Sequence, residues 1–597
     1  MIQSTPVKTG HTTRSAMASP PRGSPRPTSP LARPAPARRA FPTRLAVLGV
    51  AALAAFLAGA YVGRPGDDPA RAAAQAFADA WARGDYPAMR EQLAPAARRR
   101  ATQQRLERTY RDAARVLTLV EVQAGRVGEP REDGTVQVPV RLRTRIFGTL
   151  SGRLALPTAA EGDGAGVEWR AQHVFPGLRR GEKLARTTSL PPRADIQARD
   201  GTPLAKGEAR LSELGALAAE IAGRVGPAPP ERAAELAARG VPTGAPVGLT
   251  GLERQFDREL AGTPGGVLEA GGRVLASVEP RRGRAVRTTI DPQVQRAAVE
   301  ALAGRFGGIA VLRPSDGEVL GLAGIAYSAP QPPGSTFKIV TLAAALEFGV
   351  ARPRSRYPVE TAATLEGVRL ENAHGEACGG SLRVSFAESC NSVFAPLGAK
   401  LGAKRLVAAA EAFGFNVQPS LAGAARSTIP AAAEIGDDLA LGSTAIGQGK
   451  VLATPLLMAQ IAAAIGQDGV LTSPTLRKGD DTSRTRATSP RTARTVARYM
   501  RSVVKSGTGV GAAIPGVKVA GKTGTAELRD TVNDDPDPTD PNPAPVDDVT
   551  DTDAWFTAFA PAGDPRVAVA VMLVGQGAGG ETAAPVAKLV LQRALAD

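Results

Sequence analysis

Hydrophobic and polar residues follow three different patterns in the N-terminal third of the chain. Residues 45–62 form an apolar stretch without a charged residue. Residues 68–120 place apolar side chains at helical spacing, and residues 137–156 alternate apolar and polar side chains. The first pattern is typical of a membrane span, the second of amphipathic helices and the third of half-buried strands. We therefore predict an apolar span followed by a small α+β domain that ends near residue 178.

The apolar stretch is long enough to cross a bilayer. Its eighteen residues span roughly 27 Å as a helix at about 1.5 Å per residue, close to the hydrocarbon thickness. Three arginines at 38–44 precede it, which places the N-terminus in the cytoplasm. A cleaved signal peptide is the alternative, because residues 58–60 have the small side chains of a cleavage site. We predict an uncleaved single-pass anchor at 45–63, because the preceding tail is long for a signal. Residues 66–597 are extracytoplasmic in either case.

Composition shifts mark further segments of the chain. Residues 1–44 are rich in Pro, Ser, Thr and Arg, which predicts a disordered basic tail. Prolines interrupt short helical patches over 183–283, as in an extended linker or pedestal. A new domain begins at 286, and residues 307–324 read as two strands around a Pro-Ser-Asp-Gly turn, a β-hairpin. Residues 528–553 contain nine Asp and five Pro, which predicts a low-complexity acidic loop of unassigned role.

Overall composition narrows the classes of protein to which the chain can belong. With 597 residues, 43% apolar and 22% charged, the chain is globular, which excludes wholesale disorder, collagen and a polytopic membrane protein. The net charge of +16 could suggest nucleic acid, but residues 1–44 hold eight basic and no acidic residues. The remaining +8 is ordinary for 553 residues, so we expect no nucleic-acid partner. Two Cys and three scattered His give no metal-ligand pattern.

The chemistry centres on Ser335-x-x-Lys338, at the start of a predicted helix that Gly349 ends. Positions i and i+3 share a helix face, so the Lys338 amine can reach the Ser335 hydroxyl. A lysine buried against an apolar helix loses its charge more readily and can then act as the base for the serine. Alone this motif is weak, because a capped helix with a surface lysine has the same pattern.

Two further groups of residues make the combination specific. They are Ser389, Cys390 and Asn391, and then Lys522, Thr523, Gly524 and Thr525 within a predicted strand at 517–527. Together with Ser335 and Lys338 they match the S-x-x-K, S-x-N and K-T-G set of penicillin-binding proteins and active-site-serine β-lactamases.

Over residues 286–597 the chain resembles a class B penicillin-binding protein. Residues 193–205 are similar to the linker segment of that family, although Ala194 and Ala198 depart from its pattern. Residues 66–182 resemble the nuclear-transport-factor-2-like (NTF2-like) N-terminal domain of the resistance-type subgroup. The resemblance implies a multidomain α+β fold: an NTF2-like cone, an extended dimerisation-like linker at 183–283, and a transpeptidase domain. That last domain has an antiparallel sheet flanked by helices and an all-helical subdomain.

The resemblance also implies a role for each motif residue. Ser335 attacks the carbonyl between the last two D-alanines of a peptidoglycan stem peptide, activated by Lys338. Ser389 relays a proton, and Asn391 holds Lys338 and the substrate. The terminal carboxylate is bound by Lys522, Thr523 and Thr525, and Gly524 lets the substrate lie close to the strand. The backbone N–H groups of Ser335 and Thr525 form the oxyanion hole, and β-lactams acylate Ser335. The resemblance implies that no metal or organic cofactor is required.

Several other functions compete with a D,D-transpeptidase on the cell membrane. No E-x-x-L-N segment lies between Asn391 and Lys522, which argues against a class A β-lactamase, and Asn391 replaces the Val of class D enzymes. No glycosyltransferase motif precedes residue 286, and a β-lactam sensor should carry several membrane helices. A D,D-carboxypeptidase or β-lactam hydrolase, or a silent scaffold, stays open. The expected partners are stem peptides, β-lactams and other wall-synthesis proteins.

The two cysteines lie close together in the sequence. Cys378 and Cys390 are twelve residues apart, and an extracytoplasmic compartment permits disulfides. A loop of about 12 residues is readily closed. The alternative is two unrelated small residues, with Cys390 filling the middle of its motif. We predict a disulfide that holds Ser389 and Asn391 against Lys338.

Overall fold

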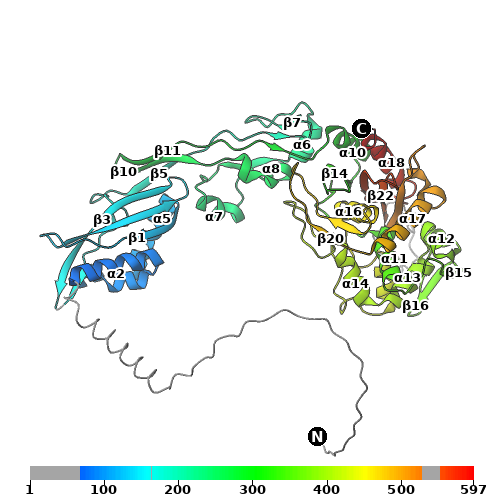
Figure 1. Cartoon of the computed structure of the whole chain (residues 1–597), viewed down its shortest axis with the longest axis horizontal. Helices are drawn as coiled ribbons and strands as arrows, with labels where there is room; N and C mark the ends of the chain where they lie inside the picture. The colour runs from blue at the N-terminus through cyan, green and yellow to red at the C-terminus, as the bar shows by residue number, and fades with distance from the viewer. Residues whose placement is uncertain (1–67, 163, 528–550, 597) are drawn as a thin grey trace, which may run out of the picture. The chain divides into compact units, whose positions relative to one another are not determined.

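The computed structural model describes residues 68–162, 164–527 and 551–596 of the chain (Figure 1). The predicted tail and anchor, and nearly all of the predicted acidic loop, lie outside the described residues. Within those described ranges, no helix combines the length and the apolar character needed to cross a membrane.

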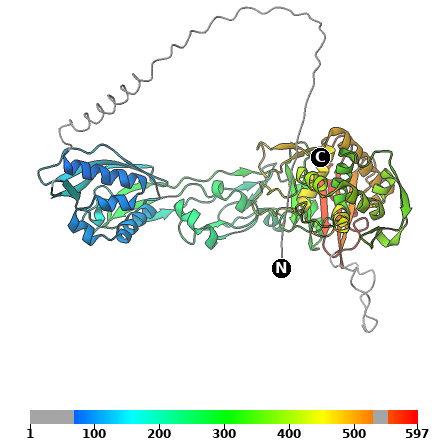
Figure 2. The ribbon, with the colours of Figure 1, turned by 90° about the horizontal axis from the view of Figure 1, so that it is seen from below.

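The first domain packs four helices against a four-stranded antiparallel sheet of order β1-β2-β3-β4. The helices are α2 (Pro69–Arg83), α3 (Tyr86–Glu91), α4 (Pro95–Arg100) and α5 (Gln103–Leu117), and the strands are β1 (Leu119–Ala124), β2 (Thr135–Thr144), β3 (Thr149–Glu161) and β4 (Gly164–Val167). Every second residue of β2 from Val136 to Leu142 is buried beneath these helices, as the alternating pattern predicts. Figure 2 shows the blue helices gathered over the sheet.

The predicted helical block ends earlier than its apolar residues suggest. Helix α5 stops at Leu117, and Thr118 adopts a left-handed conformation with φ of 50°. Leu119 and Val120, which the helical pattern included, instead begin β1. The reason is local: residues 119–124 alternate and contain β-branched valines, which favour a strand.

The linker region is more regular than its prolines suggest, because they lie mostly between elements. A long hairpin of β10 (Gly265–Ala270) and β11 (Arg273–Val278) pairs with β5 (Leu184–Ser189). The remaining elements are β6 (Ile196–Gln197), β7 (Pro203–Ala205), α6 (Ala216–Ala222), β8 (Val225–Pro227), α7 (Pro230–Ala238), β9 (Pro246–Gly248), α8 (Gly251–Gln255), α9 (Asp257–Leu260) and β12 (Val286–Arg287).

A buried ion cluster holds this linker region together. Glu253 accepts from Arg193 at 2.6 Å and from Arg210 at 2.6 Å. Asp257 binds Arg193 at 2.9 Å and Arg232 at 2.8 Å. Both carboxylates are almost fully buried, so removal of one partner leaves an uncompensated charge and destabilises the fold strongly.

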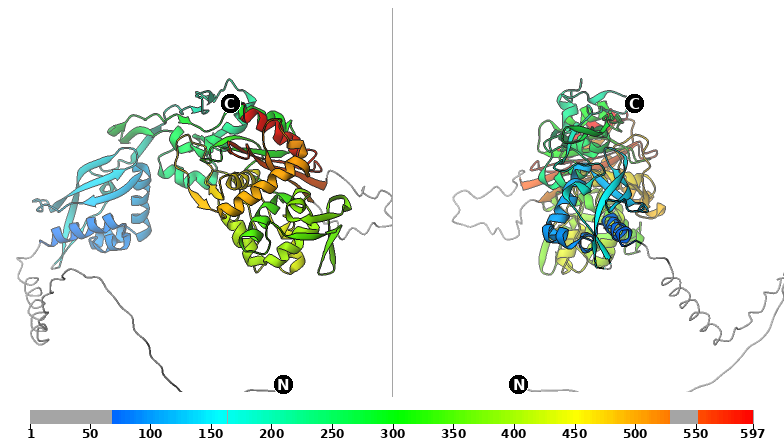
Figure 3. Two further views of the ribbon diagram at one scale, coloured as in Figure 1. Left: turned by 45° about the vertical axis from the view of Figure 1, so that its right-hand side comes forward. Right: turned by 90° about the vertical axis from the view of Figure 1, so that its left-hand side faces the viewer.

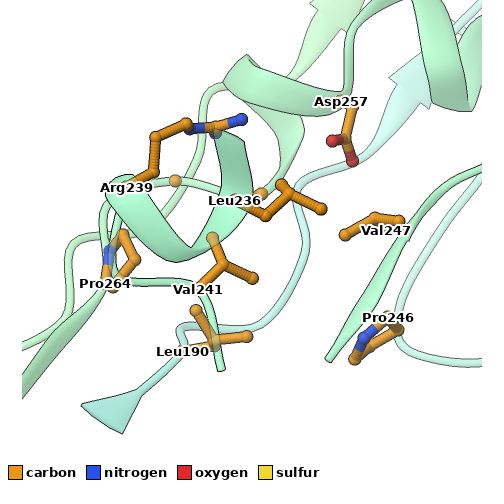
Figure 4. Close-up of a pocket in the computed structure, with 10 residues that line it drawn as sticks. Leu190, Leu236, Arg239, Val241, Pro246, Val247, Asp257 and Pro264 are labelled. Carbon is orange, nitrogen blue, oxygen red and sulfur yellow. The ribbon is translucent and has the colours of Figure 1, made fainter. Parts of the chain in front are cut away.

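A small apolar pocket lies beside this cluster. Leu190, Leu236 and Val241 face one another there, with Val247 across from them (Figure 4). The carboxylate at its edge, Asp257, already accepts hydrogen bonds from Arg232 and from the Gly248 N–H, both at 2.8 Å, and forms an ion pair with Arg193. The pocket therefore belongs to the packing of the linker region and carries no catalytic constellation.

The last domain is built on a five-stranded antiparallel sheet of order β14-β13-β23-β22-β21. Its strands are β13 (Gly307–Leu312), β14 (Val319–Gly324), β21 (Ala520–Glu527), β22 (Thr552–Ala560) and β23 (Val567–Leu573). The predicted hairpin at 307–324 is confirmed by the pairing of β13 with β14. Strand β21 forms one edge of the sheet.

Helices cover both faces of that sheet. Ile309 and Val311 pack with α10 (Pro292–Leu302), which lies beside α18 (Ala583–Ala594) on one face, and Ala310 and Leu312 pack with α16 (Pro455–Gly466) on the other. Helix α11 (Lys338–Glu347) contacts the helical subdomain. Figure 3 shows the red α18 and the yellow α16 on opposite sides of the strands.

A mainly helical subdomain and several short hairpins complete the domain. Their elements are η2 (Gly334–Phe337), β15 (Arg356–Glu360), β16 (Ala362–Leu365), β17 (Val368–Glu371), η3 (Ala373–Gly375), β18 (Cys378–Ser381), α12 (Leu382–Ala387), α13 (Asn391–Leu401), α14 (Ala403–Ala412), α15 (Asp438–Ala445), β19 (Val470–Thr472), β20 (Arg484–Arg486), α17 (Pro490–Ser506) and η4 (Val510–Ala512). The predicted multidomain α+β fold is confirmed.

Candidate active site

Ser335 lies on a tight turn that precedes helix α11. The predicted single helix begins instead as the 3₁₀ turn η2, and α-helical geometry starts at Lys338. The N–H of Gly334 donates to the carbonyl of Gly447 at 3.0 Å, and Gly334 has φ of 49°. A Cβ on Gly334 would come within 2.4 Å of the Thr525 carbonyl oxygen. Glycine at 334 is therefore required for the turn to pack against β21.

The Ser335 side chain is only partly buried. Within the described residues its hydroxyl has no hydrogen-bond partner. A substrate carbonyl can therefore approach Oγ without first breaking a bond.

Lys338 sits one turn further along, fully buried. Its Nζ donates to the Ser389 carbonyl at 2.7 Å and to Asn391 Oδ1 at 2.6 Å. Burial, and then the positive charge of Lys522, hold the pKa of Lys338 well below its usual value. The lowered pKa favours the neutral amine, whose two N–H groups can bind these two acceptors. Its lone pair is then left to accept a proton.

Ser389 connects the two buried lysines. Its Oγ lies 2.8 Å from Nζ of Lys522 and 3.3 Å from Nζ of Lys338. Its backbone is left-handed, with φ of 63°, which is uncommon for serine and is found where surrounding contacts enforce it. This conformation directs carbonyl and hydroxyl of one residue toward the same cluster.

Asn391 begins helix α13, and both ends of its amide are bonded. Oδ1 accepts from Lys338, and Nδ2 donates to the Glu371 carbonyl at 2.6 Å. The second bond fixes which end of the amide faces the lysine.

Strand β21 supplies the third motif. Lys522 is fully buried, and burial lowers its pKa to about 7, opposed by the nearby carboxylate of Glu388. Thr523 Oγ1 lies 2.6 Å from Thr508 Oγ1. At Gly524 a Cβ would come within 2.8 Å of the Pro333 carbonyl oxygen, so a side chain would push the strand from the serine turn. The Thr525 side chain accepts from the Gly579 N–H at 3.4 Å.

The structure joins Cys378 and Cys390 in a disulfide, with Cα atoms 5.4 Å apart. Cys378 starts β18, so the bridge ties that strand to the residue between Ser389 and Asn391. Ser392 Oγ adds a bond to the Cys378 carbonyl at 3.1 Å. The S-x-N segment is thus held from outside its own helix.

Sequence reasoning assigned no site role to Thr508 or Gly447, which touch the motifs. Thr508 follows α17, 15 residues before Thr523, and Gly447 follows α15, far along the chain from the serine turn that it contacts. A hydroxyl or glycine between helices follows no spacing rule that would assign it to a site.

In the described ranges no group of three His, Cys, Asp or Glu side chains is placed to hold a metal ion.

Comparisons with known proteins agree with this geometry. Residues 307–592 match the family model of the penicillin binding protein transpeptidase domain, 201–288 the penicillin-binding protein dimerisation domain, and 69–182 the NTF2-like N-terminal transpeptidase domain. Peptidoglycan D,D-transpeptidase PbpA of Mycolicibacterium smegmatis is 35% identical over 422 residues, which cover 58% of this chain and 80% of that relative. The chain belongs to the class B penicillin-binding proteins.

Other members of the family show the same relationship. PbpA of Mycobacterium tuberculosis is 36% identical over 420 residues, covering 58% of this chain and 79% of that protein. The structure of penicillin-binding protein A from M. tuberculosis as a penicillin G acyl-enzyme complex covers 68% of this chain and 99% of its own, with a TM-score of 0.54 and 29% identity. The D,D-transpeptidase domain from Eggerthella lenta has a TM-score of 0.54 and 29% identity, covering 68% and 98%. The resemblance seen in the motifs, including the NTF2-like domain, is confirmed.

Proposed function

We propose that this penicillin-binding protein is a peptidoglycan D,D-transpeptidase with Ser335 as its nucleophile. The observation that carries the assignment of the site is the state of Lys338. Its amine is buried, it donates to the Ser389 carbonyl and to Asn391 Oδ1, its pKa is lowered, and it lies on the turn after Ser335. The relatives named as D,D-transpeptidases support the reaction.

In the first step Ser335 Oγ attacks the carbonyl between the last two D-alanines of a stem peptide. Its proton passes to Nζ of Lys338 as the Oγ–C bond forms. The backbone N–H groups of Ser335 and Thr525 stabilise the oxyanion. When the intermediate collapses, the C–N bond breaks, and the proton returns through Ser389 Oγ to the leaving amine of D-alanine.

Binding of the terminal carboxylate falls to β21. Lys522 supplies positive charge, and Thr523 and Thr525 supply hydroxyl donors. Thr508 is the positioning residue for Thr523, because their hydroxyl oxygens lie 2.6 Å apart. Gly524 leaves the edge of the strand open for the backbone of the substrate.

In the second step an amine of another stem peptide attacks the acyl-enzyme. The amine loses a proton to the Lys338 and Ser389 pair as the new C–N bond forms. The ester bond to Ser335 Oγ then breaks, Oγ recovers a proton, and the cross-linking amide is released. Attack by water instead would make a D,D-carboxypeptidase or a β-lactam hydrolase, and no reaction with stem peptides would make a silent scaffold or a β-lactam sensor.

The sequence and the relatives support a membrane location for the enzyme. We infer a single-pass membrane protein with residues 1–44 in the cytoplasm, an anchor at 45–63, and residues 66–597 outside. The uncharged stretch 45–62 and the relatives' peptidoglycan chemistry support this topology. Stem peptides and β-lactams are the proposed ligands, and other wall-synthesis proteins are the proposed partners.

A donor stem peptide and a labelled acceptor amine test the reaction directly. The full chain is expected to release D-alanine and form the cross-linked product, detected by mass spectrometry. Release of D-alanine with hydrolysed donor alone would assign a carboxypeptidase, and no release would assign a scaffold or sensor. A long-lived penicilloyl-enzyme is expected, and rapid repeated hydrolysis of a chromogenic cephalosporin would contradict the transpeptidase.

A further inference from the structure

Helix α17 carries a row of basic side chains that the chemistry above does not use. They recur every three or four residues, which places them on one face, and all are exposed: Arg491, Arg494, Arg498, Arg501 and Lys505. The opposite face is buried in the domain, with Val496, Met500 and Val503 among its side chains. We call the row of five basic side chains the basic ridge.

Folding of the helix does not explain the basic ridge. The seventeen residues of α17 contain no acidic residue, whereas an exposed helix normally gains from opposite charges three or four positions apart. Arg491 lies in the first turn, where the helix dipole disfavours positive charge. Among the described residues, one ion pair reaches the ridge, from Arg494 to Asp468 at 3.3 Å. The other four basic side chains have no ion-pair partner among the described residues, so they are available to an anion from outside the domain.

Neighbouring segments add further positive charge beside the ridge. Arg383 of α12 donates to Ser502 Oγ at 3.3 Å. Tyr499 donates from its hydroxyl to the Pro353 carbonyl at 2.8 Å, which brings the exposed Arg352 and Arg354 near α17. The positive surface therefore extends across three segments of the domain.

The basic ridge leads to the active site. Lys505 lies three residues before Thr508, whose hydroxyl contacts Thr523 of the carboxylate-binding strand at 2.6 Å. The Thr508 N–H donates to the carbonyl of Ala387 at 3.2 Å, two residues before Ser389. The row of cations is thus continuous with the end of the site that takes a carboxylate.

We propose that the basic ridge binds the carboxylates of an uncross-linked peptidoglycan strand while one stem of that strand occupies the site at Ser335. The proposal rests on the proposed function. Each neighbouring stem also ends in a D-alanine carboxylate, so a strand repeats the anion that β21 recognises once. At about 1.5 Å per residue, α17 is roughly 25 Å long, which extends well beyond one stem terminus. The enzyme then prefers polymer to isolated stem peptide.

Anisotropy titrations with labelled uncross-linked strands test the proposal, using the full chain in detergent micelles at increasing NaCl. The variant is Arg491→Gln, Arg498→Gln and Arg501→Gln together. The matched control, Arg99→Gln, Arg100→Gln and Arg108→Gln, removes the same charge from exposed positions on α4 and α5. The ridge variant is expected to weaken strand binding about tenfold and to flatten its salt dependence. The control should bind within about twofold of wild type.

Two further measurements distinguish strand binding at the ridge from damage to the active site and from unspecific attraction of anions. Acylation by penicillin G should stay within about twofold of wild type, since the ridge lies outside the acylation chemistry. Strands whose carboxyl groups are converted to methylamides should bind wild type and the ridge variant equally weakly. Unchanged strand binding by the ridge variant, or an equal loss in the control, would overturn the proposal. A loss specific to inorganic polyphosphate, with strand binding intact, would also overturn it.

These assays distinguish a failure of the proposed function from a failure of the proposal for the basic ridge. If the chain binds strands through the ridge but forms no cross-links, the proposed function fails and the ridge stands. If it cross-links soluble stem peptides and the ridge variant binds strands normally, the ridge alone fails.

Discussion

The carbonyl oxygen of Ser389 lies 2.7 Å from Nζ of Lys338, and the left-handed backbone of Ser389, with φ of 63°, makes that contact. A carbonyl is a pure acceptor, so it binds an N–H of the lysine and leaves the lone pair free. Ser389, the first residue of the S-x-N motif, therefore has two roles. Its backbone orients the Lys338 amine, and its hydroxyl links Lys338 to Lys522. The orientation of the Lys338 amine therefore depends on the backbone conformation of Ser389.

Replacement of the base tests that relationship. Lys338→Ala is expected to slow acylation of Ser335 by about 10²–10⁴-fold, the usual contribution of a positioned base. The rate constant for penicillin acylation measures it by stopped-flow fluorescence. Lys400→Ala, at a surface position on α13, is the control and should acylate as wild type does. A Lys338→Ala variant within tenfold of wild type would show that another group accepts the proton.

The buried lysine of β21 predicts a pH dependence of stability. Burial lowers the pKa of Lys522 to about 7 in the folded state, below its usual value in the unfolded chain. Between these pKa values the unfolded state binds more protons, so wild type gains stability as pH rises above about 7. Lys522→Met has no such group. The free energy of unfolding of wild type relative to Lys522→Met should therefore increase between about pH 7 and 10. A constant difference over that range would contradict the depressed pKa.

The disulfide is expected to matter more for the reaction than for the fold. It closes a loop of twelve residues in sequence, for which the chain-entropy model gives roughly 3 kcal/mol. The bridge holds the segment that positions Lys338. Cys378→Ser, or reduction of wild type, should therefore slow penicillin acylation clearly. The melting temperature should decrease only modestly. The variant itself should not respond to reductant. Unchanged acylation after verified reduction would contradict this role.

Gly447 and Gly449 lie in one loop and allow a matched test of what positions the turn at Ser335. Gly447 and Gly449 have φ of 80° and 70°, so alanine is similarly strained at both. A Cβ on Gly447 would lie 2.0 Å from the Gly334 carbonyl oxygen, whereas nothing lies within 4 Å of a Cβ on Gly449. Gly447→Ala should lower the acylation rate more than tenfold beyond Gly449→Ala, while both keep the far-ultraviolet circular dichroism of wild type. Equal rates would show that Gly447 does not position the turn.

The sequence predicted the elements whose pattern is local. The alternation in β2, the hairpin of β13 and β14, and the strand carrying Lys522 all follow from spacing and burial. The boundary at Thr118 was missed because the helical spacing was continued through Leu119 and Val120, although the alternation of residues 119–124 favours a strand.

The candidate site likewise combines features that the sequence predicts with features that it does not. Three motifs could be read from residue types and order, and the structure brings Lys338, Ser389, Asn391 and Lys522 into one hydrogen-bonded cluster. The contacts of Thr508 and Gly447 could not be read, because they arise where α17 and the loop after α15 meet the motifs in space. The left-handed Ser389 is likewise a product of its tertiary contacts.

The most direct test of the proposed chemistry is the identity of the residue that penicillin acylates. Intact-mass labelling of the full chain with penicillin G, followed by peptide mapping, should give one adduct per chain on the peptide that contains Ser335. Ser335→Ala should lose the adduct while keeping its melting temperature, because Oγ makes no hydrogen bond within the described residues. The control Ser506→Ala, at an exposed position at the end of α17, should label fully. An adduct on another residue, or undiminished labelling of Ser335→Ala, would contradict the assignment of Ser335 as the nucleophile.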